Sequence, residues 1–346
     1  MSAEPNIEAP QAPTRPADIG RWLFWGPFRN LLNPKRPMSI AKMYGLWRLQ
    51  YKTAGSNREL MSDELRRCFG EQYTADQYED LVRNAYRCAW RVHLEELLIG
   101  KVGPDSVDKW IEFDGIENLD NALSKGKGVV WVYPHAGAVM MMMAWLSHHG
   151  YAYTQYAARG LAPAEIAAEH PELLASNRWR ERVREIREAN EDRLPAKFLT
   201  HHDSARELYR RLAANELVGI AYDGRIGRRW APFDYLGRTA LLNTGPYRLA
   251  ASTGAAIVPV FCSTPVGKPA RCQVGTPVHV EKKDWKSAAT QVLATQQQWI
   301  QAHPEEYGIW LLHARHRRNI DDHPLFIDHA EDDRWKRWVP SEKMGA

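Results

Sequence analysis

The stretch Gly128–Gly150, GVVWVYPHAGAVMMMMAWLSHHG, places His135 inside an apolar run almost long enough to cross a membrane. A spanning helix would hold Pro134 and His135 near the bilayer centre, where polar groups are costly. The segment Val129–Tyr133 is instead typical of a strand buried on both faces, as parallel strands between layers of helices are. The following AVMMMMAWL is apolar on every side and predicts a buried helix.

This interpretation places His135 at the carboxyl end of a strand and directly before a helix. Open α/β sheets bind their ligands at that edge. Pro134 and Gly137 allow a tight turn that presents the imidazole to a crevice, and the helix N-terminus stabilises negative charge beside it. His135 is therefore a candidate catalytic base, and the alternative is a structural histidine in the core.

The rest of the chain alternates strand and helix patterns, which predicts an α/β fold. Apolar residues at three- and four-residue spacing predict helices between residues 19 and 100, with Ser62 and Thr74 as N-caps. Further strands are expected at 110–113 and 151–156, and in LVGIAYD and AAIVPVFCS. Further helices are expected at 119–125 and 204–214, and in SNRWRERVREIREANEDR, GPYRLAASTG and DWKSAATQVLATQQQWIQAHPEEY. We expect APFDYLGR to form a turn.

No change of composition after Ile40 marks a linker, so one large α/β domain is expected. We assign residues 1–18 to a disordered leader, 19–105 to a helical N-terminal extension, 106–320 to the α/β domain and 321–346 to a C-terminal tail. The leader is rich in Pro, Ala and Glu and lacks the basic and apolar regions of a secretory signal.

The formal net charge of +4 is mildly basic, which suits an anionic membrane surface or a phosphate-bearing ligand and does not require nucleic acid. The four cysteines form no C-x-x-C pair and no metal-ligand spacing, so we expect free thiols and no metal site. The early tryptophans and arginines of IGRWLFWGPFRNLLNPKRP suit a membrane interface or packing on the core, and both interpretations stay open.

Three segments together resemble the late acyltransferases of lipid A biosynthesis, which belong to the lysophospholipid acyltransferase superfamily. They are FDGIENLDNALSKGKGVVWVYPHAG, YDGRIGRRWAPFDYLGRTALLNTGPYRLAASTGAAIVPVF and HPEEYGIWLLHARHRR. The resemblance implies a mixed, mostly parallel sheet flanked by helices. It also implies a cytoplasmic enzyme, peripheral at the inner membrane, that transfers a fatty acyl group from acyl carrier protein or coenzyme A to a lipid or sugar hydroxyl. The acyl thioester is then a co-substrate, and no cofactor is implied.

The resemblance also implies site residues. His135 corresponds to the general base, which takes the proton of the acceptor as it attacks the thioester. Asp223 lies where the family has an acidic residue after a strand. For Arg178, in the charged helix, the alternative is a solvated helix face. The residues implied to bind substrate are Arg159, Arg178, Phe233, Gly237 and Arg238.

The sequence departs from the family at one position. The family motif is His, four residues, then Asp or Glu, and here that last position holds Met140. Among the neighbouring histidines only His202 is followed at this spacing by an acid, Glu207, and helical geometry would separate the two side chains by about 140°. Asp223 or a backbone carbonyl is left to orient His135.

Three alternatives to acylation of a lipid or sugar hydroxyl stay open. A weakly supported base suits an amine or hydroxylamine acceptor, because neutral amines attack thioesters without prior deprotonation. A variant of this function takes the acyl group from aminoacyl-tRNA, the one nucleic acid considered as a partner. A degenerate homologue would instead bind lipid or an acyl carrier without catalysis.

Overall fold

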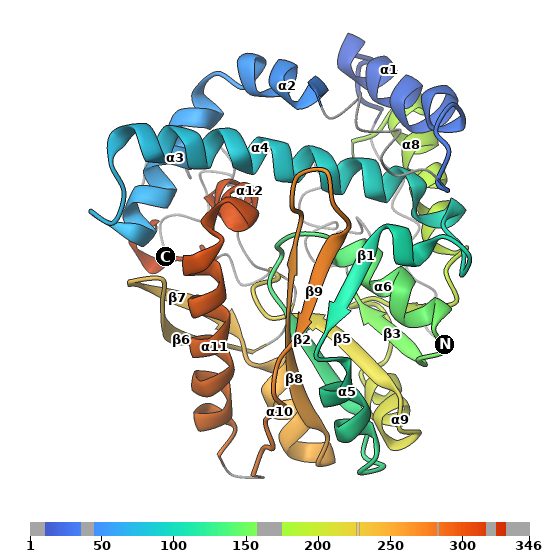
Figure 1. The fold of residues 1–346 in the computed structure, drawn as a ribbon, viewed down its shortest axis with the longest axis vertical. Coiled ribbons are helices and arrows are strands. Elements are labelled where there is room, and N and C mark those ends of the chain that lie inside the picture. The colour runs from blue at the N-terminus through green and yellow to red at the C-terminus, as the bar shows by residue number, and fades with distance from the viewer. Residues whose placement is uncertain are drawn as a thin grey trace.

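The computed structural model describes residues 11–35, 45–157, 175–225, 227, 229–281, 284–315 and 323–329. A seven-stranded sheet runs through the molecule in the order β1-β9-β8-β2-β5-β3-β4 (Figure 1). Every neighbouring pair in it is parallel except β8 and β9. The predicted mixed, mostly parallel sheet is confirmed. Its strands are β1 (Ile111–Asp114), β2 (Val129–Tyr133), β3 (Tyr153–Tyr156), β4 (Lys197–Leu199), β5 (Leu217–Ala221), β8 (Ala256–Ser263) and β9 (Ala270–Val274).

Helices flank this sheet on both faces, and α4 lies across one end of it with α12 against α4 (Figure 1). The helices of the N-terminal part are α1 (Pro16–Leu23), the π-helix η1 (Phe24–Phe28), α2 (Trp47–Thr53), α3 (Ser56–Phe69) and α4 (Ala75–Leu98). Those that follow are α5 (Ile116–Leu123), α6 (Val139–His148), α8 (Arg178–Glu191), α9 (Arg206–Ala213), α10 (Gly245–Thr253), α11 (Trp285–Ala302) and α12 (Pro304–Arg315). Short 3₁₀ helices are η3 (Ile99–Lys101), η4 (Val107–Lys109) and η6 (Ile327–His329).

Strand β2 occupies the centre of the sheet, between β8 and β5. Val130 and Val132 point into a core cluster that includes residues of α10 and α11. Val129, Trp131 and Tyr133 point into a second cluster that includes residues of α5 and α6. This alternation buries both faces of the strand, and the predicted bounds of this strand are confirmed.

Two predicted N-caps have different outcomes. The Thr74 hydroxyl accepts the backbone N–H of Gln77, and the Gln77 side chain accepts the backbone N–H of Thr74. This reciprocal capping box confirms Thr74. The prediction for Ser62 is wrong, because α3 already begins at Ser56, directly after Gly55, and Ser62 lies inside it.

The turn predicted in APFDYLGR is present only at Leu236 and Gly237, and the residues before it form a strand. Residues Trp230–Tyr235 (β6) and Arg238–Asn243 (β7) form an antiparallel hairpin (Figure 1). Its two turn residues, Leu236 and Gly237, have φ values of 52° and 72°, as a type I′ turn requires. Leucine is rare in that conformation, and here its backbone N–H donates to Gln297 while its side chain is buried in the core.

Three further elements differ from the prediction. The strands β4 and β9 were not predicted, although the alternating burial of β9 is a period-two pattern. The last long helix is two helices, α11 and α12, divided at His303. Pro304 causes the division, because proline disfavours helical backbone in the residue before it.

Parts of the expected leader and tail have defined structure. Helix α1 begins at Pro16, and the buried Asp18 carboxylate accepts hydrogen bonds from Asn177 and Arg180 of the α8 region. Near the other end, Asp328 forms an ion pair with Arg238. Among the helices of the described residues, none is both long and apolar enough to span a membrane.

Candidate active site

The turn after β2 delivers His135 to the sheet edge. Pro134 ends the strand, and α6 begins at Val139. Between them Gly137 adopts a φ of 64°, and a Cβ atom at this position would collide with the backbone carbonyl of Cys262 in β8. Glycine is therefore required for the turn to pass close to the neighbouring strand. The turn leaves the His135 side chain 39% exposed.

Asp223 meets His135 at this edge. It lies two residues beyond β5, which pairs with β2 in parallel, so the two side chains follow strands that end side by side. Asp223 is fully buried. Its Oδ1 atom lies 2.6 Å from Nδ1 of His135, and its Oδ2 atom accepts the His135 backbone N–H at 3.0 Å. Of the two orienting groups left open by the sequence, the structure places the Asp223 carboxylate at the ring.

This contact selects the tautomer of the imidazole. A carboxylate accepts hydrogen bonds, so the proton is assigned to Nδ1 of His135 and the lone pair to Nε2. The carboxylate also stabilises the imidazolium that forms when Nε2 takes a proton. The pair can therefore accept a proton from a bound hydroxyl or amine.

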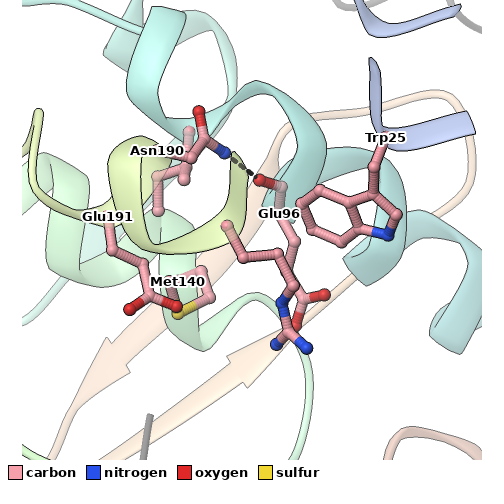
Figure 2. Close-up of a pocket in the computed structure, with 7 residues that line it drawn as sticks. Trp25, Glu96, Met140, Asn190 and Glu191 are labelled. Atoms are coloured by element: carbon pink, nitrogen blue, oxygen red, sulfur yellow. Dashed lines mark hydrogen bonds between the residues drawn. The ribbon is translucent and has the colours of Figure 1, made fainter. Parts of the chain in front are cut away.

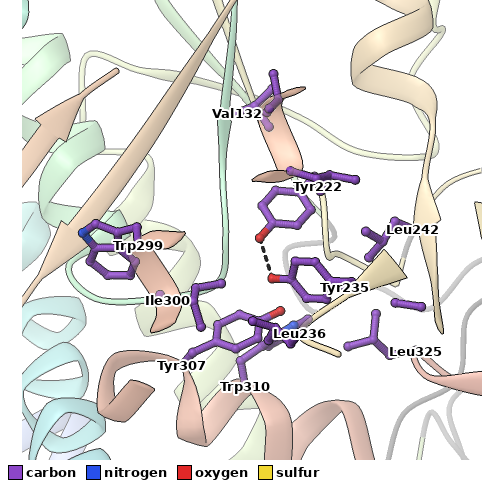
Figure 3. Packing of buried hydrophobic residues seen from close by; sticks show 14 of the residues in the cluster. Val132, Tyr222, Tyr235, Leu236, Leu242, Trp299, Ile300, Tyr307, Trp310 and Leu325 are labelled. Atoms are coloured by element: carbon purple, nitrogen blue, oxygen red, sulfur yellow. Dashed lines mark hydrogen bonds between the residues drawn. The ribbon is translucent and has the colours of Figure 1, made fainter. Parts of the chain in front are cut away.

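Helix α12 contributes two aromatic residues that the sequence analysis missed. The Tyr307 hydroxyl donates to Oδ2 of Asp223 at 2.9 Å. The Trp310 ring stacks on the His135 ring, with 3.8 Å between ring centroids and 11° between planes. Figure 3 shows Tyr307 and Trp310 beside the hydrogen-bonded pair Tyr222 and Tyr235. The available signal was the spacing of Tyr307 and Trp310 by three residues, which puts both on one helix face.

The tyrosines around Asp223 are neutral. Burial raises the pKa of Tyr222, Tyr235 and Tyr307 well above the ordinary value, and the charge of Asp223 raises it further. They therefore donate hydrogen bonds or pack at neutral pH and add no second negative charge. Asp223 is the carboxylate that balances a charged His135.

Met140 lines a small cavity of about 20 Å³ between α6, α8 and the end of α4 (Figure 2). Two carboxylates, Glu96 and Glu191, line the same cavity together with Arg187. The cavity beside the position at which the family motif has its acid therefore already holds two carboxylates and one cation from other elements. The carboxylate at His135 comes instead from Asp223, which follows the neighbouring strand β5.

We expect that Met140→Glu does not strengthen the site. The new carboxylate would lie beside Glu96 and Glu191 with Arg187 as the facing cation, so we predict a stability loss of about 2 kcal/mol and no gain in activity. Denaturant unfolding and transfer rates measure both effects, with Met140→Leu as the volume-matched control. Faster acyl transfer to hydroxyls in Met140→Glu would contradict this account of the site.

The other residues implied to bind substrate are distributed differently. Phe233 lies in β6, partly buried against the core, and Gly237 is exposed in the hairpin turn. Arg238 lies in a buried ion cluster, where its guanidinium donates to Glu64 through Nη1 and to Asp328 through Nε and Nη2. These bonds engage all three of its nitrogens within the protein, which fits a structural role for Arg238.

Arg178 is exposed at the start of α8, with its guanidinium over the Trp179 ring at 4.6 Å. Arg159 lies outside the described residues. His202 precedes α9 instead of lying in it, and Glu207 pairs with Arg210 and Arg211 of that helix. The expectation that His202 and Glu207 share a helix is wrong.

All four cysteines are free and buried. The residues implied by the resemblance include no metal ligand set. Within the described ranges, no group of three or more His, Cys, Asp or Glu side chains could hold a metal ion.

A histidine held by a buried carboxylate, at the strand ends of an α/β sheet, is an arrangement that enzymes use for general-base catalysis. The sequence profile of the bacterial lipid A biosynthesis acyltransferases matches residues 39–318, which is most of the chain. The chain therefore belongs to the bacterial lipid A biosynthesis acyltransferase family. This confirms the resemblance drawn from its three segments.

The chain is also similar to proteins named phosphatidylinositol mannoside acyltransferase. The one from Mycolicibacterium smegmatis is 25% identical over 213 residues, which are 62% of this chain and 65% of that protein. The one from Mycobacterium tuberculosis is 28% identical over 148 residues, which are 43% of this chain and 42% of that protein. The matched region spans less than two thirds of either relative.

Proposed function

We propose that this protein is an acyltransferase that moves an acyl group from a thioester donor to a lipid or sugar acceptor, with His135 as the general base. The observation that carries the proposal is the 2.6 Å contact between Nδ1 of His135 and the buried Asp223 carboxylate. It gives the imidazole the orientation and charge support that Met140 cannot supply. Membership of an acyltransferase family supports the reaction class.

In the proposed reaction, Nε2 of His135 takes the proton of the acceptor hydroxyl as its oxygen attacks the thioester carbonyl carbon. A new C–O bond forms, and the carbonyl oxygen carries the negative charge of the tetrahedral intermediate. When the carbonyl re-forms, the C–S bond breaks and the thiolate leaves. The imidazolium returns its proton to the thiolate, which gives an ester, a free thiol and the starting form of the site.

The supported base favours a hydroxyl acceptor. The amine or hydroxylamine hypothesis depends on a base without its supporting acid, and Asp223 lies at His135 as such an acid. The donor in this proposal is acyl carrier protein or coenzyme A carrying the acyl group, and no cofactor takes part. The named activity of the two relatives supports a lipid or a lipid-linked sugar as acceptor.

We further propose that the enzyme acts as a peripheral protein at the cytoplasmic face of the inner membrane. Leu23 and Leu31 are 48% and 81% exposed, and Arg21, two residues before Leu23, is also exposed. Apolar side chains next to cations are the combination that interfacial segments use to bind anionic lipid surfaces. Co-sedimentation with vesicles that contain anionic lipid tests this location.

The function is tested by incubating the full chain with acyl-coenzyme A or acyl carrier protein thioesters and a bacterial lipid extract. Mass spectrometry of the products identifies the donor and the acceptor together. We expect one acylated lipid or glycolipid with the wild-type protein, and a rate at least a thousandfold lower with His135→Ala.

Transfer by His135→Ala at the wild-type rate would remove His135 as the base. An acylated amine as product would restore the amine hypothesis, and a requirement for aminoacyl-tRNA would support the variant donor. Lipid or carrier binding without transfer from any thioester would favour the degenerate homologue. His148→Ala serves as a control, because the His148 ring contacts the backbone carbonyl of Val102 outside the site.

A further inference from the structure

Helix α12 is fixed at its start, close to the sheet edge that carries the site. It begins at Pro304, after the division at His303. The buried Glu306 carboxylate accepts the Thr264 hydroxyl at 2.9 Å, just beyond the end of β8. This contact anchors the first turn of α12 to the sheet. Tyr307 and Trp310 follow on the same helix, separated by about one turn.

Tyr307 completes the hydrogen bonding of Asp223. The carboxylate accepts the His135 ring at Oδ1, and at Oδ2 it accepts the His135 backbone N–H and the Tyr307 hydroxyl. These donors come from two parts of the fold, the turn after β2 and helix α12, so together they restrict the rotation of the carboxylate. Both Asp223 and Tyr307 are fully buried, and hydrogen bonds to a buried carboxylate are strong and directional.

Trp310 covers one face of the His135 ring. The nearly parallel stacking at 3.8 Å limits the rotation of the imidazole, whose side chain stays 39% exposed. The face of an indole ring attracts a cation through the ring quadrupole. Trp310 therefore interacts more strongly with the imidazolium than with the neutral imidazole.

We propose that α12 is a structural part of the catalytic base, with Tyr307 and Trp310 as positioning residues. Tyr307 holds the Asp223 carboxylate in line with Nδ1 of His135, and Trp310 holds the imidazole and stabilises its protonated form. This inference rests on the proposed function of His135. It adds contacts from a helix far along the chain to the support that Asp223 gives in place of position 140.

The titratable groups around Asp223 determine how the pH dependence of kcat/KM is interpreted. The titratable groups that face Asp223 besides His135 and Tyr307 are Tyr133, Tyr222, Tyr235, Tyr247 and Arg225. Burial raises the pKa of each tyrosine, and it lowers the pKa of Arg225 only to about 10. None of these changes charge between pH 5 and 8. Burial also raises the pKa of Glu306, in the first turn of α12, to about 7, so the acid limb of the kcat/KM profile is assigned to His135 only if Glu306→Gln leaves it in place.

The test compares Trp310→Leu, Trp310→Phe and Tyr307→Phe in the full chain, with the thioester and acceptor that the wild-type protein uses. Removing the indole destabilises the imidazolium, so the acid limb of the kcat/KM profile should move to lower pH by about half a unit in Trp310→Leu. Trp310→Phe should restore most of this movement, because phenylalanine keeps an aromatic face. Tyr307→Phe should lower kcat about tenfold with KM unchanged.

Matched controls separate positioning from general packing. Trp299 in α11 is as buried as Trp310 and stacks on His303 instead of His135, so Trp299→Leu should leave the acid limb in place. The Tyr78 hydroxyl is also bonded inside the protein, to the Gly70 carbonyl, so Tyr78→Phe is the control for Tyr307→Phe. Ring ¹⁵N shifts of His135 add a readout that does not need turnover. They should show the Nδ1-protonated form in the wild type and a mixture of tautomers in Tyr307→Phe.

The inference would be overturned if Trp310→Leu and Tyr307→Phe had the same pH profile, kcat and ring ¹⁵N shifts as the wild type while His135→Ala was inactive. If His135→Ala keeps its activity, the proposed function itself fails. The two failures are thus distinguishable. Should Trp310→Leu not fold, as circular dichroism would show, the decision rests on Tyr307→Phe and its ring shifts.

Discussion

Replacing Asp223 by Asn is expected to lower kcat for acyl transfer by about four orders of magnitude, the scale at which triad enzymes respond to the same change. The amide keeps the shape of the side chain. It offers an N–H group where the carboxylate offered only acceptors. The His135 ring can then carry its proton on Nε2 instead of Nδ1, and in this tautomer Nε2 cannot accept the proton of the acceptor. The loss should appear in kcat, because the interaction acts on the transition state.

Steady-state kinetics and a thermal melt of Asp223→Asn check this prediction together. Because Asp223 is fully buried, the melt establishes that the variant is folded before its rate is interpreted. Asp234 in the exposed part of β6 provides the control, since Asp234→Asn makes the same chemical change away from His135. A folded Asp223→Asn variant within tenfold of the wild-type rate would refute the role of Asp223.

Replacing Glu64 by Gln is expected to give the largest loss of stability. Glu64 lies fully buried in α3, where it pairs with Arg238 at 2.8 Å, Arg315 at 3.0 Å and His329 at 3.0 Å. Removing one partner of a buried ion pair leaves uncompensated charge and costs about 3–5 kcal/mol. Denaturant unfolding at neutral pH measures this loss, and Glu59→Gln, at an exposed position of the same helix, is the control.

The same residue gives the stability a defined pH dependence. Burial alone raises the pKa of Glu64, but the hydrogen bond and charge of His329 and the charge of Arg238 outweigh it and lower the pKa to about 2. A lowered pKa means that the folded state holds the carboxylate charged more readily than the unfolded state does. The contribution of Glu64 is therefore fully present above pH 4.5 and is lost as the pH falls towards 2.

Glu64 contributes about 3 kcal/mol to the free energy of unfolding, from the difference between the ordinary glutamate pKa of 4.5 and its pKa of about 2 in the folded protein. Unfolding free energies measured between pH 5 and 2 should fall more steeply for the wild type than for Glu64→Gln. Parallel curves for the two proteins would show that the ion cluster of Arg238 does not hold Glu64 in its charged form.

The sequence alone predicts those site residues that come just after a strand, His135 and Asp223. A short, continuously apolar segment bounded by Gly128 and Pro134 leaves little choice but a buried strand, and β2 has the predicted bounds. Two parallel strands end at one edge, so the residues after them, His135 and Asp223, are natural partners. Their contact nevertheless needs the order of the strands, which a single sequence does not reveal.

The contributions of α12 could not be predicted, because they depend on how a distant helix packs against the sheet. Tyr307 and Trp310 sit in an apolar helix pattern that equally suits core packing. The hairpin of β6 and β7 was missed for a local reason. Pro232 argues against a strand, and its turn uses Leu236 where glycine or asparagine is usual. Arg238 was expected to face a substrate, and only the fold reveals its ion partners.

The central claim is that His135 and Asp223 act as one unit in place of the family motif. It is tested most directly by the rate of acyl transfer in the double variant His135→Ala with Asp223→Ala, measured beside the two single variants. If the residues act as a unit, the double variant should be about as slow as His135→Ala alone, because the carboxylate has no function without the imidazole. A double variant slower by the product of the two single losses would show that the residues act independently and would contradict the claim.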